Sequence, residues 1–195
     1  MRTDVFGLWG RSVGAGIVDI TGLTGNTNDR SLGDLTMKIL AAAIAAFAVS
    51  AAVNAAEPVV ATPAKEQLKF LESKDPQLAA NKKLVWDMWR TFLSAHHIDA
   101  ADTYLAPEYH QHNPNAETGR DGVKAYFTAQ KLPPIDVPDS IDGLISMVAE
   151  RDLVTLALKR EYKDKDGKPY TTTWFDMFRI ANGKIVEHWD TAQKQ

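Results

Sequence analysis

The chain has no cysteine among its 195 residues. This absence excludes a disulfide-stapled scaffold, a thiolate zinc site and a cysteine nucleophile. An excess of positive charge is missing as well, because 22 basic residues stand against 25 acidic ones and the formal net charge is −3. No basic field is therefore available to attract nucleic acid or an anionic membrane surface. The rest of the composition, 45% hydrophobic and 24% charged, is typical of a globular protein.

An apolar run near the start of the chain is too short for a membrane-spanning helix. It extends from Ile39 to Val53, which is 15 residues, whereas a span needs about 20. Lys38 precedes it and Ala55-Ala56 follow it, so it has the charged start, apolar centre and small-residue exit of a signal peptide. The pattern predicts cleavage near Ala55, a periplasmic or secreted protein and no stable membrane anchor after processing. A membrane anchor is the alternative interpretation.

These features divide the chain into four parts. Residues 1–36 are rich in Gly, Thr, Asn and Asp and are interpreted as an upstream or disordered leader. Residues 37–55 are the expected signal peptide, and residues 56–76 a linker with a short helical segment. Residues 77–195 are expected to form the folded domain.

Helical periodicity dominates the first half of this domain. Apolar residues recur every three to four positions between residues 77 and 96, which predicts an amphipathic helix that begins after Pro76. Shorter helices are expected at 64–73, at 99–105 and after Asp121 as an N-cap. The residues expected to pack the first long helix onto a core are Val85, Met88, Trp89 and Phe92.

The second half of the domain changes to a period of two. Strands are predicted at residues 141–149, 153–162, 170–180 and 184–192. Asp166-Gly167 and Asn182-Gly183 are strong hairpin signals because both pairs tolerate positive φ. Helices followed by an antiparallel meander predict an α+β fold, in which a curved sheet over helices leaves a cavity at its concave face.

Strand alternation predicts which side chains share a face of the last hairpin. One face would carry Trp174, Asp176 and Phe178 together with His188 and Asp190; the other would carry Phe175, Met177 and Arg179 with Ile185, Glu187 and Trp189. Which face lines the cavity is open at this point. Titratable groups inside an aromatic wall favour the first face as a site, although surface or structural roles are the alternative.

The histidines of the chain offer a metal site as a further interpretation. His110 and His112 with His188 and Asp190 would offer suitable ligands. Histidines two apart share a face only on a regular strand, however, and no acidic helix motif supports them. We therefore expect no metal and no cofactor.

Four segments resemble a known family. YHQHNP at 109–114, GRDG at 119–122, FDMFR at 175–179 and GKIVEHWD at 183–190 are similar to the SnoaL-like polyketide cyclase branch of the nuclear transport factor 2 (NTF2-like) superfamily, over residues 79 to 192. The resemblance implies an α+β cone, with helices packed on a strongly curved antiparallel sheet that encloses one pocket. It also implies a homodimer formed through the sheet.

The resemblance implies roles for individual residues. Asp190 occupies the place of the cyclases' acid/base aspartate, and Asn113 that of a pocket asparagine. Asp176 corresponds to an aspartate that donates to an oxyanion in the related ketosteroid isomerases. Those isomerases have a basic aspartate at the place of Asn113, and an amide cannot accept the proton, which counts against their route.

These points predict a pocket protein with acid/base catalysis, by aldol-type cyclisation or isomerisation, on a small hydrophobic carbonyl compound. Such an enzyme would be a lyase, isomerase or cyclase. The alternatives are a non-catalytic periplasmic or secreted ligand-binding protein and a hydrolase or dehydratase. The predicted catalytic residues are Asp190 with His188 or His112 to orient it, and the predicted substrate-binding residues are Asn113, Asp176, Trp174, Phe178 and Tyr109. Asn113 is expected to reach the cavity from the same side as His112, where either residue would orient Asp190.

Overall fold

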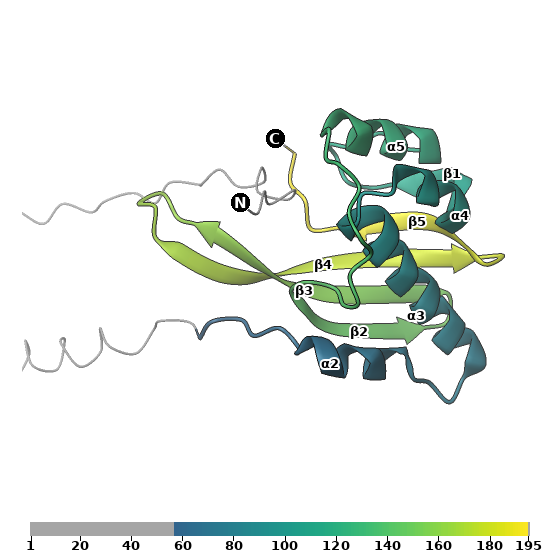
Figure 1. Cartoon of the computed structure of the whole chain (residues 1–195), viewed down its shortest axis with the longest axis horizontal. Helices are drawn as coiled ribbons and strands as arrows, with labels where there is room; N and C mark the ends of the chain where they lie inside the picture. Colours follow the sequence, from purple (N-terminus) through teal and green to yellow (C-terminus); the bar gives the residue numbers. More distant parts are fainter. Residues whose placement is uncertain (1–56, 195) are drawn as a thin grey trace, which may run out of the picture. The chain divides into compact units, whose positions relative to one another are not determined.

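A computed structural model describes residues 57–194, in which the helices and one strand come first and the other strands of the sheet last (Figure 1). The expected leader and signal peptide lie outside these residues. The helices are α2 (Ala64–Gln67), α3 (Pro76–Met88), α4 (Ala101–Tyr104) and α5 (Arg120–Ala129), with short 3-10 or π-helical turns at Leu68–Leu71, Trp89–Ser94 and Ile98–Ala100. The strands are β1 (Leu105–Gln111), β2 (Leu144–Glu150), β3 (Leu153–Lys163), β4 (Pro169–Ala181) and β5 (Lys184–Asp190).

Helix α3 begins where the sequence predicts. The Asp75 carboxylate accepts the backbone N–H groups of Gln77, at 2.8 Å, and Leu78, at 3.3 Å, which satisfies two donors that a helix start leaves free. Pro76 occupies the first turn, where no N–H is needed. The predicted apolar stripe is confirmed, because all four of its members are buried in the core: Val85, Met88, Trp89 and Phe92.

Helix α5 begins differently from the prediction. Its N-cap is Gly119, with φ of +88°, and not Asp121, which lies in the first turn and is exposed. A glycine adopts this backbone conformation without strain, so the chain enters the helix two residues earlier. Asp121 keeps a favourable place, since a negative charge complements the N-terminal end of the helix dipole.

The five strands form one sheet in the order β1-β5-β4-β3-β2. The predicted antiparallel meander of β2 to β5 is confirmed. The sheet is not antiparallel throughout, however, because β1 pairs with β5 in parallel. The segment that gave no clear strand pattern, residues 108–114, thus contributes to a strand whose partner is remote in sequence.

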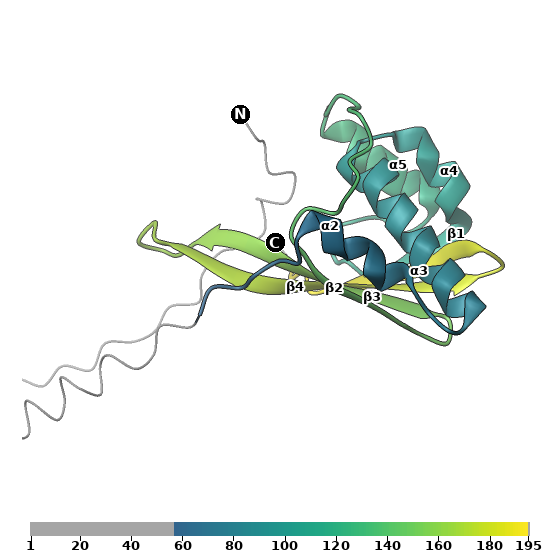
Figure 2. The same ribbon diagram turned by 60° about the horizontal axis from the view of Figure 1, so that its bottom comes forward.

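All four helices lie on one side of the sheet, and no helix of residues 57–194 covers its other face (Figures 1 and 2). Between helices and sheet lies one cluster of buried hydrophobic side chains, with Trp86 and Phe92 from the helical side and Leu156 and Ile185 from the sheet.

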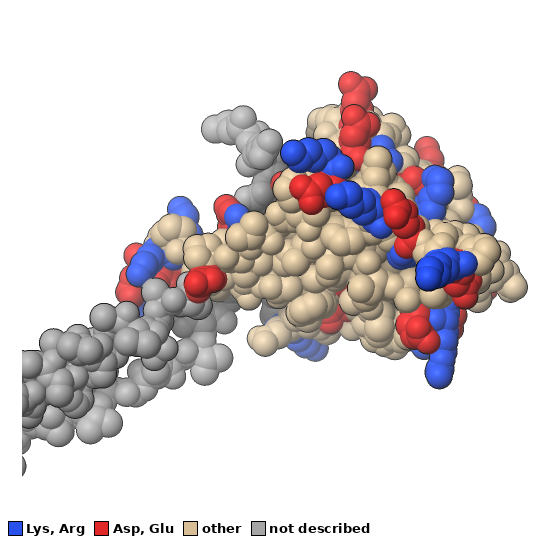
Figure 3. Space-filling model, turned by 90° about the horizontal axis from the view of Figure 1, so that it is seen from below, with Lys and Arg blue, Asp and Glu red and all other residues tan. Residues whose placement is uncertain are grey.

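On the surface drawn in Figure 3, positive and negative side chains are interspersed without a large area of one sign. Within the described part of the chain, no helix is both long and apolar enough to cross a bilayer.

A bulge in the last hairpin changes the face of Ile185. Arg179 pairs with Glu187, but Ile180 pairs with Ile185, so β5 has one extra residue at this point. Ile185 therefore points into the core, where it is fully buried. The strict alternation that placed Ile185 with Glu187 on the opposite face was wrong at this residue, while His188 and Asp190 keep the predicted face.

Candidate active site

The cavity lies between the helices and the inner face of the sheet. Its volume is about 90 Å³, counted over the centres of water-sized spheres, and one water needs about 10–15 Å³ on that measure. A small ligand can therefore enter. The apolar wall comes mainly from α3, the π-helical turn after it, α5, β1 and β4: Met88, Trp89, Phe92, Leu105, Val123, Phe127, Trp174 and Phe178.

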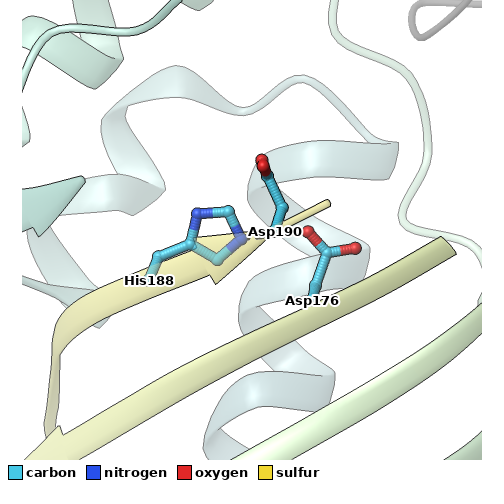
Figure 4. A group of neighbouring side chains, drawn as sticks. All are labelled: Asp176, His188 and Asp190. Atoms are coloured by element: carbon cyan, nitrogen blue, oxygen red, sulfur yellow. Dashed lines mark hydrogen bonds and ion pairs between the residues drawn. The ribbon is translucent and has the colours of Figure 1, made fainter. Parts of the chain in front are cut away.

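Two carboxyl groups and an imidazole stand on the floor of this cavity. Asp176 on β4 and Asp190 at the end of β5 are direct cross-strand partners, and His188 is the partner of Phe178. Figure 4 shows the side chains of Asp176, His188 and Asp190 rising from the two strands on the same side of the sheet. This placement follows from the tight Asn182-Gly183 turn, at which both residues have positive φ.

The carboxylate of Asp190 is held by two donors. Nδ2 of Asn113 donates to Oδ2 at 2.7 Å, and the backbone N–H of Ala192 donates to Oδ1 at 2.9 Å. Each carboxylate oxygen therefore has a partner of fixed position. Asn113 was expected either to donate to the substrate or to orient Asp190, and the structure has one of its amide hydrogens on Asp190, as the second role requires.

Asp176 and His188 form a buried pair. Nε2 of His188 lies 2.9 Å from Oδ1 of Asp176, and both side chains are less than a tenth exposed. The imidazole is held further by Gln111, whose Oε1 lies 2.9 Å from Nδ1, and by Phe178, which stacks on it with ring centres 4.6 Å apart. The other oxygen of Asp176, Oδ2, is buried without a hydrogen-bond partner among the described residues.

Two tyrosines beside these carboxyl groups stay protonated. Burial raises the pKa of Tyr109 well above its ordinary value, and the charges of Asp176 and Asp190 raise it further. Burial also raises the pKa of Tyr126, with a smaller contribution from Asp190. Both side chains line the cavity, so each offers a neutral phenol as a hydrogen-bond donor over a wide pH range.

The predicted site residues are brought together with one exception. The predicted residues that do line the cavity are Asp190, His188, Asn113, Asp176, Trp174, Phe178 and Tyr109. His112 does not line the cavity. Its Nε2 lies 2.8 Å from Oε1 of Glu187, and its ring stacks on Trp189 with ring centres 5.1 Å apart. The position expected for His112 was wrong, because alternation along the chain sends it to the side of Glu187 and Trp189. Its hydrogen bond, aided by Arg179, lowers the pKa of Glu187.

Gln111 was missed by the sequence analysis. It lines the cavity and contacts the imidazole of His188 directly. The signal that could have identified it is alternation, since Tyr109, Gln111 and Asn113 share parity and all line the cavity. Tyr126 and Arg160, which also line it, carry no motif that would have singled them out.

The three polar residues of β4 and β5 in the cavity also have the geometry of metal ligands. The donor atoms of Asp176, His188 and Asp190 lie within 4.8 Å of one another. The four-residue set considered from sequence is not assembled, because His110 and His112 are exposed and absent from the cavity wall. Two carboxylates and one imidazole would suit a divalent transition metal.

Chemically, the arrangement combines a base with donors. Asp190 has an ordered carboxylate within a mostly apolar wall, and such a group can accept a proton from a C–H bond next to a carbonyl. The phenols of Tyr109 and Tyr126 can donate to the oxygen on which negative charge then develops.

The chain is similar to a known domain family and to several solved structures. The sequence pattern of a domain family described as "SnoaL-like domain" matches residues 86–188, more than half of the chain. No curated protein matches the chain. Similar solved structures include a proposed polyketide cyclase from Acidithiobacillus ferrooxidans, with 19% identity over 63% of this chain and 92% of that one and a TM-score of 0.45. A proposed SnoaL-like polyketide cyclase from Jannaschia sp. CCS1 has 12% identity over 62% and 91%, with a TM-score of 0.45.

Proposed function

The chain belongs to the SnoaL-like domain family, and we propose that its cavity is the active site of an enzyme acting on a small hydrophobic carbonyl compound. Asp190 takes a proton from the carbon next to the carbonyl, and the electron pair of that bond moves onto the carbonyl oxygen. The resulting enolate either attacks a second carbonyl, whose oxygen then takes the proton from Asp190, as in aldol-type cyclisation, or regains the proton at another carbon, as in isomerisation.

One observation carries this proposal. The Asp190 carboxylate stands in an apolar cavity with both oxygens oriented, by Asn113 and by the backbone of Ala192. A base fixed in this way needs little reorganisation when it accepts a proton. The neutral phenol of Tyr109, close enough to Asp176 and Asp190 for their charges to raise its pKa, supplies a donor for the enolate oxygen.

The experiment follows exchange of the α-hydrogens of 2-tetralone, a hydrophobic ketone, in D2O by proton NMR. The native protein should accelerate exchange, and Asp190→Asn should lower that rate by about 10²–10⁴-fold while leaving the affinity for the ketone near that of the native protein. Glu187→Gln is the matched control, since Glu187 is on the same strand but contacts His112 and Arg179 outside the cavity. Equal exchange rates for the native protein and Asp190→Asn would contradict the proposal.

A non-catalytic ligand-binding protein is the second candidate. The aromatic and aliphatic wall of the cavity favours it, because such a wall binds a hydrophobic ligand whether or not chemistry follows. The two functions differ in one readout: a binding protein would hold 2-tetralone without accelerating its exchange, and Asp190→Asn would change only the affinity.

We also propose that the protein is exported and acts as a homodimer. The signal-peptide pattern of residues 37–55 supports export. The helix-free face of the sheet supports self-association, since it carries the exposed side chains of Val148 and Phe175.

A further inference from the structure

Gln111 fixes one hydrogen on the imidazole of His188. Its Oε1 lies 2.9 Å from the backbone nitrogen of Asn113 and 2.9 Å from Nδ1 of His188. A backbone N–H can only donate, so the amide atom between these two groups is the oxygen and not the nitrogen. An amide oxygen can only accept, and Nδ1 of His188 therefore carries a hydrogen.

The second ring nitrogen then shares a single proton with Asp176. Nε2 lies 2.9 Å from Oδ1, and a hydrogen bond between them needs one proton. That proton lies either on Nε2 of an imidazolium facing a carboxylate or on Oδ1 of a carboxylic acid facing a neutral imidazole. The pair is neutral overall in both arrangements. In both, the other oxygen of Asp176, Oδ2, has no hydrogen and can only accept.

This acceptor lacks a donor within the described part of the chain. Oδ2 is buried and makes no hydrogen bond there, and Asp176 is only 6% exposed. A buried acceptor has lost its water, so leaving it without a partner is unfavourable. Asp176 lines the cavity, and the missing donor is thus a group that enters the cavity.

We propose that Gln111 is a positioning residue that confines the proton of the Asp176–His188 pair to the contact between Nε2 and Oδ1, and that Oδ2 of Asp176 accepts a hydrogen bond from a hydroxyl or N–H group of the ligand. The inference deepens the proposed function and rests on it only in placing the ligand in this cavity. The ligand is a hydrophobic molecule with a donor group in addition to its carbonyl. Asp176 does not donate to an enolate, the role implied by resemblance to ketosteroid isomerases, and Tyr109 remains as the neutral donor.

The first test observes the proton by nitrogen-15 NMR of the full-length protein. We expect Nδ1 of His188 to be protonated in the native protein. Gln111→Glu should keep this signature, because a carboxylate also accepts from both neighbours, whereas Gln111→Leu should lose it. Gln130→Leu is the matched control: Gln130 lines the cavity from the end of α5 and should leave the His188 signals unchanged.

Two results would overturn the proton assignment. One is an unprotonated Nδ1 in the native protein. The other is tight Zn²⁺ binding that moves the Nε2 signal of His188, which would make Asp176, His188 and Asp190 a cation site in place of a proton-sharing pair.

The second test compares 2-naphthol with 2-methoxynaphthalene, which differs in having no donor. We expect the native protein to bind the naphthol at least about tenfold more tightly, as followed by the fluorescence of Trp89 and Trp174 in the cavity wall. Asp176→Asn should retain this preference, because its amide nitrogen can donate to Nε2 and leave the oxygen free to accept. Asp176→Leu should bind both compounds equally.

Equal affinities for the two compounds in the native protein would overturn the acceptor assignment without any use of a variant. The measurement involves no turnover, so it is separate from the exchange experiment on 2-tetralone. Asp190→Asn separates the two proposals. If this variant still binds 2-naphthol more tightly than 2-methoxynaphthalene but exchanges 2-tetralone at the native rate, the catalytic proposal is refuted and this inference stands.

Discussion

Nδ2 of Asn113 lies 2.7 Å from Oδ2 of Asp190, although 77 residues separate the two in the chain. The parallel pairing of β1 with β5 brings them together. Asn113 lies two residues after the end of β1, and Asp190 is the last residue of β5. In this position the amide orients a carboxylate, a role for which a second aspartate would be unsuitable, since two carboxylates this close repel each other.

Replacement of Asn113 by leucine should slow the exchange of 2-tetralone. The change removes a hydrogen bond to a charged group, worth about 1.5–3 kcal/mol, which corresponds to roughly 10–100-fold in rate if the orientation of Asp190 limits the reaction. Proton NMR of the exchange measures this directly. His110→Leu, at an exposed position of β1, should keep the native rate; a native rate in Asn113→Leu would mean that the amide does not support the base.

Tyr109 should make stability fall as the solution becomes alkaline. Its pKa is raised well above the ordinary value of about 10 by burial and by Asp176 and Asp190. Above about pH 10 the unfolded chain releases this proton while the folded protein retains it, so the unfolded state binds fewer protons and the free energy of unfolding decreases with pH. Chemical denaturation between pH 9 and about pH 11 should show a steeper loss for the native protein than for Tyr109→Phe; parallel curves would contradict the assignment.

The hairpin of β4 and β5 could be predicted because its signals are local. Alternation and the Asn-Gly pair gave the strands and placed Asp176, His188 and Asp190 on one face, as the structure has them. The bulge at Ile185 has no such signal. It depends on how β5 fits against Ile180 and the core, and alternation therefore placed this one residue on the wrong face.

The contribution of β1 was harder to predict, since its pairing is not local. Without the parallel partner β5, residues 108–114 have no pattern that identifies a strand, and His112 was assigned to the cavity although it lies on the opposite side. For the same reason Gln111 was missed: its contact with His188 joins positions 77 residues apart. His112 was placed in the cavity because histidine is a common catalytic residue, whereas the alternation of side chains along β1 places Gln111 there.

Trp89→Ala should destabilise the domain by about 3–5 kcal/mol, as large-to-small changes of aromatic core residues do. Trp89 is 4% exposed and packs edge-to-face on Phe178, with ring centres 6.2 Å apart. Urea denaturation should show the loss as a lower midpoint. Leu68→Ala is the control, because Leu68 is 59% exposed, lies outside the proposed dimer face and should change the midpoint little. An unmoved midpoint for Trp89→Ala would contradict the packing of α3 on the sheet.

Export should remove the first part of the chain. The apolar run of residues 39–53, followed by Ala55-Ala56, predicts cleavage near Ala55 when the full-length chain is expressed in a host with a secretion pathway. N-terminal sequencing of the recovered protein measures the cleavage site. A change of Ala45 to Arg in the middle of the run should block processing, because a charge interrupts the apolar centre that the pathway recognises. Soluble cytosolic protein that still begins at residue 1 would contradict export.

The helix-free face of the sheet should form the interface of a homodimer. Val148 and Phe175 expose large side chains there, at 61% and 48%, and exposed apolar surface on one face is a mark of protein–protein interaction sites. Phe175→Lys should therefore convert a dimer into a monomer in sedimentation equilibrium, since it would bury two unpaired charges at a two-fold interface. Leu68→Lys is the matched control, because Leu68, at 59%, is at least as exposed as Phe175 but lies in the turn after α2 on the helical side. If both variants remain dimeric, the interface lies elsewhere; if the native protein is already a monomer, the open face of the sheet has no partner of its own kind.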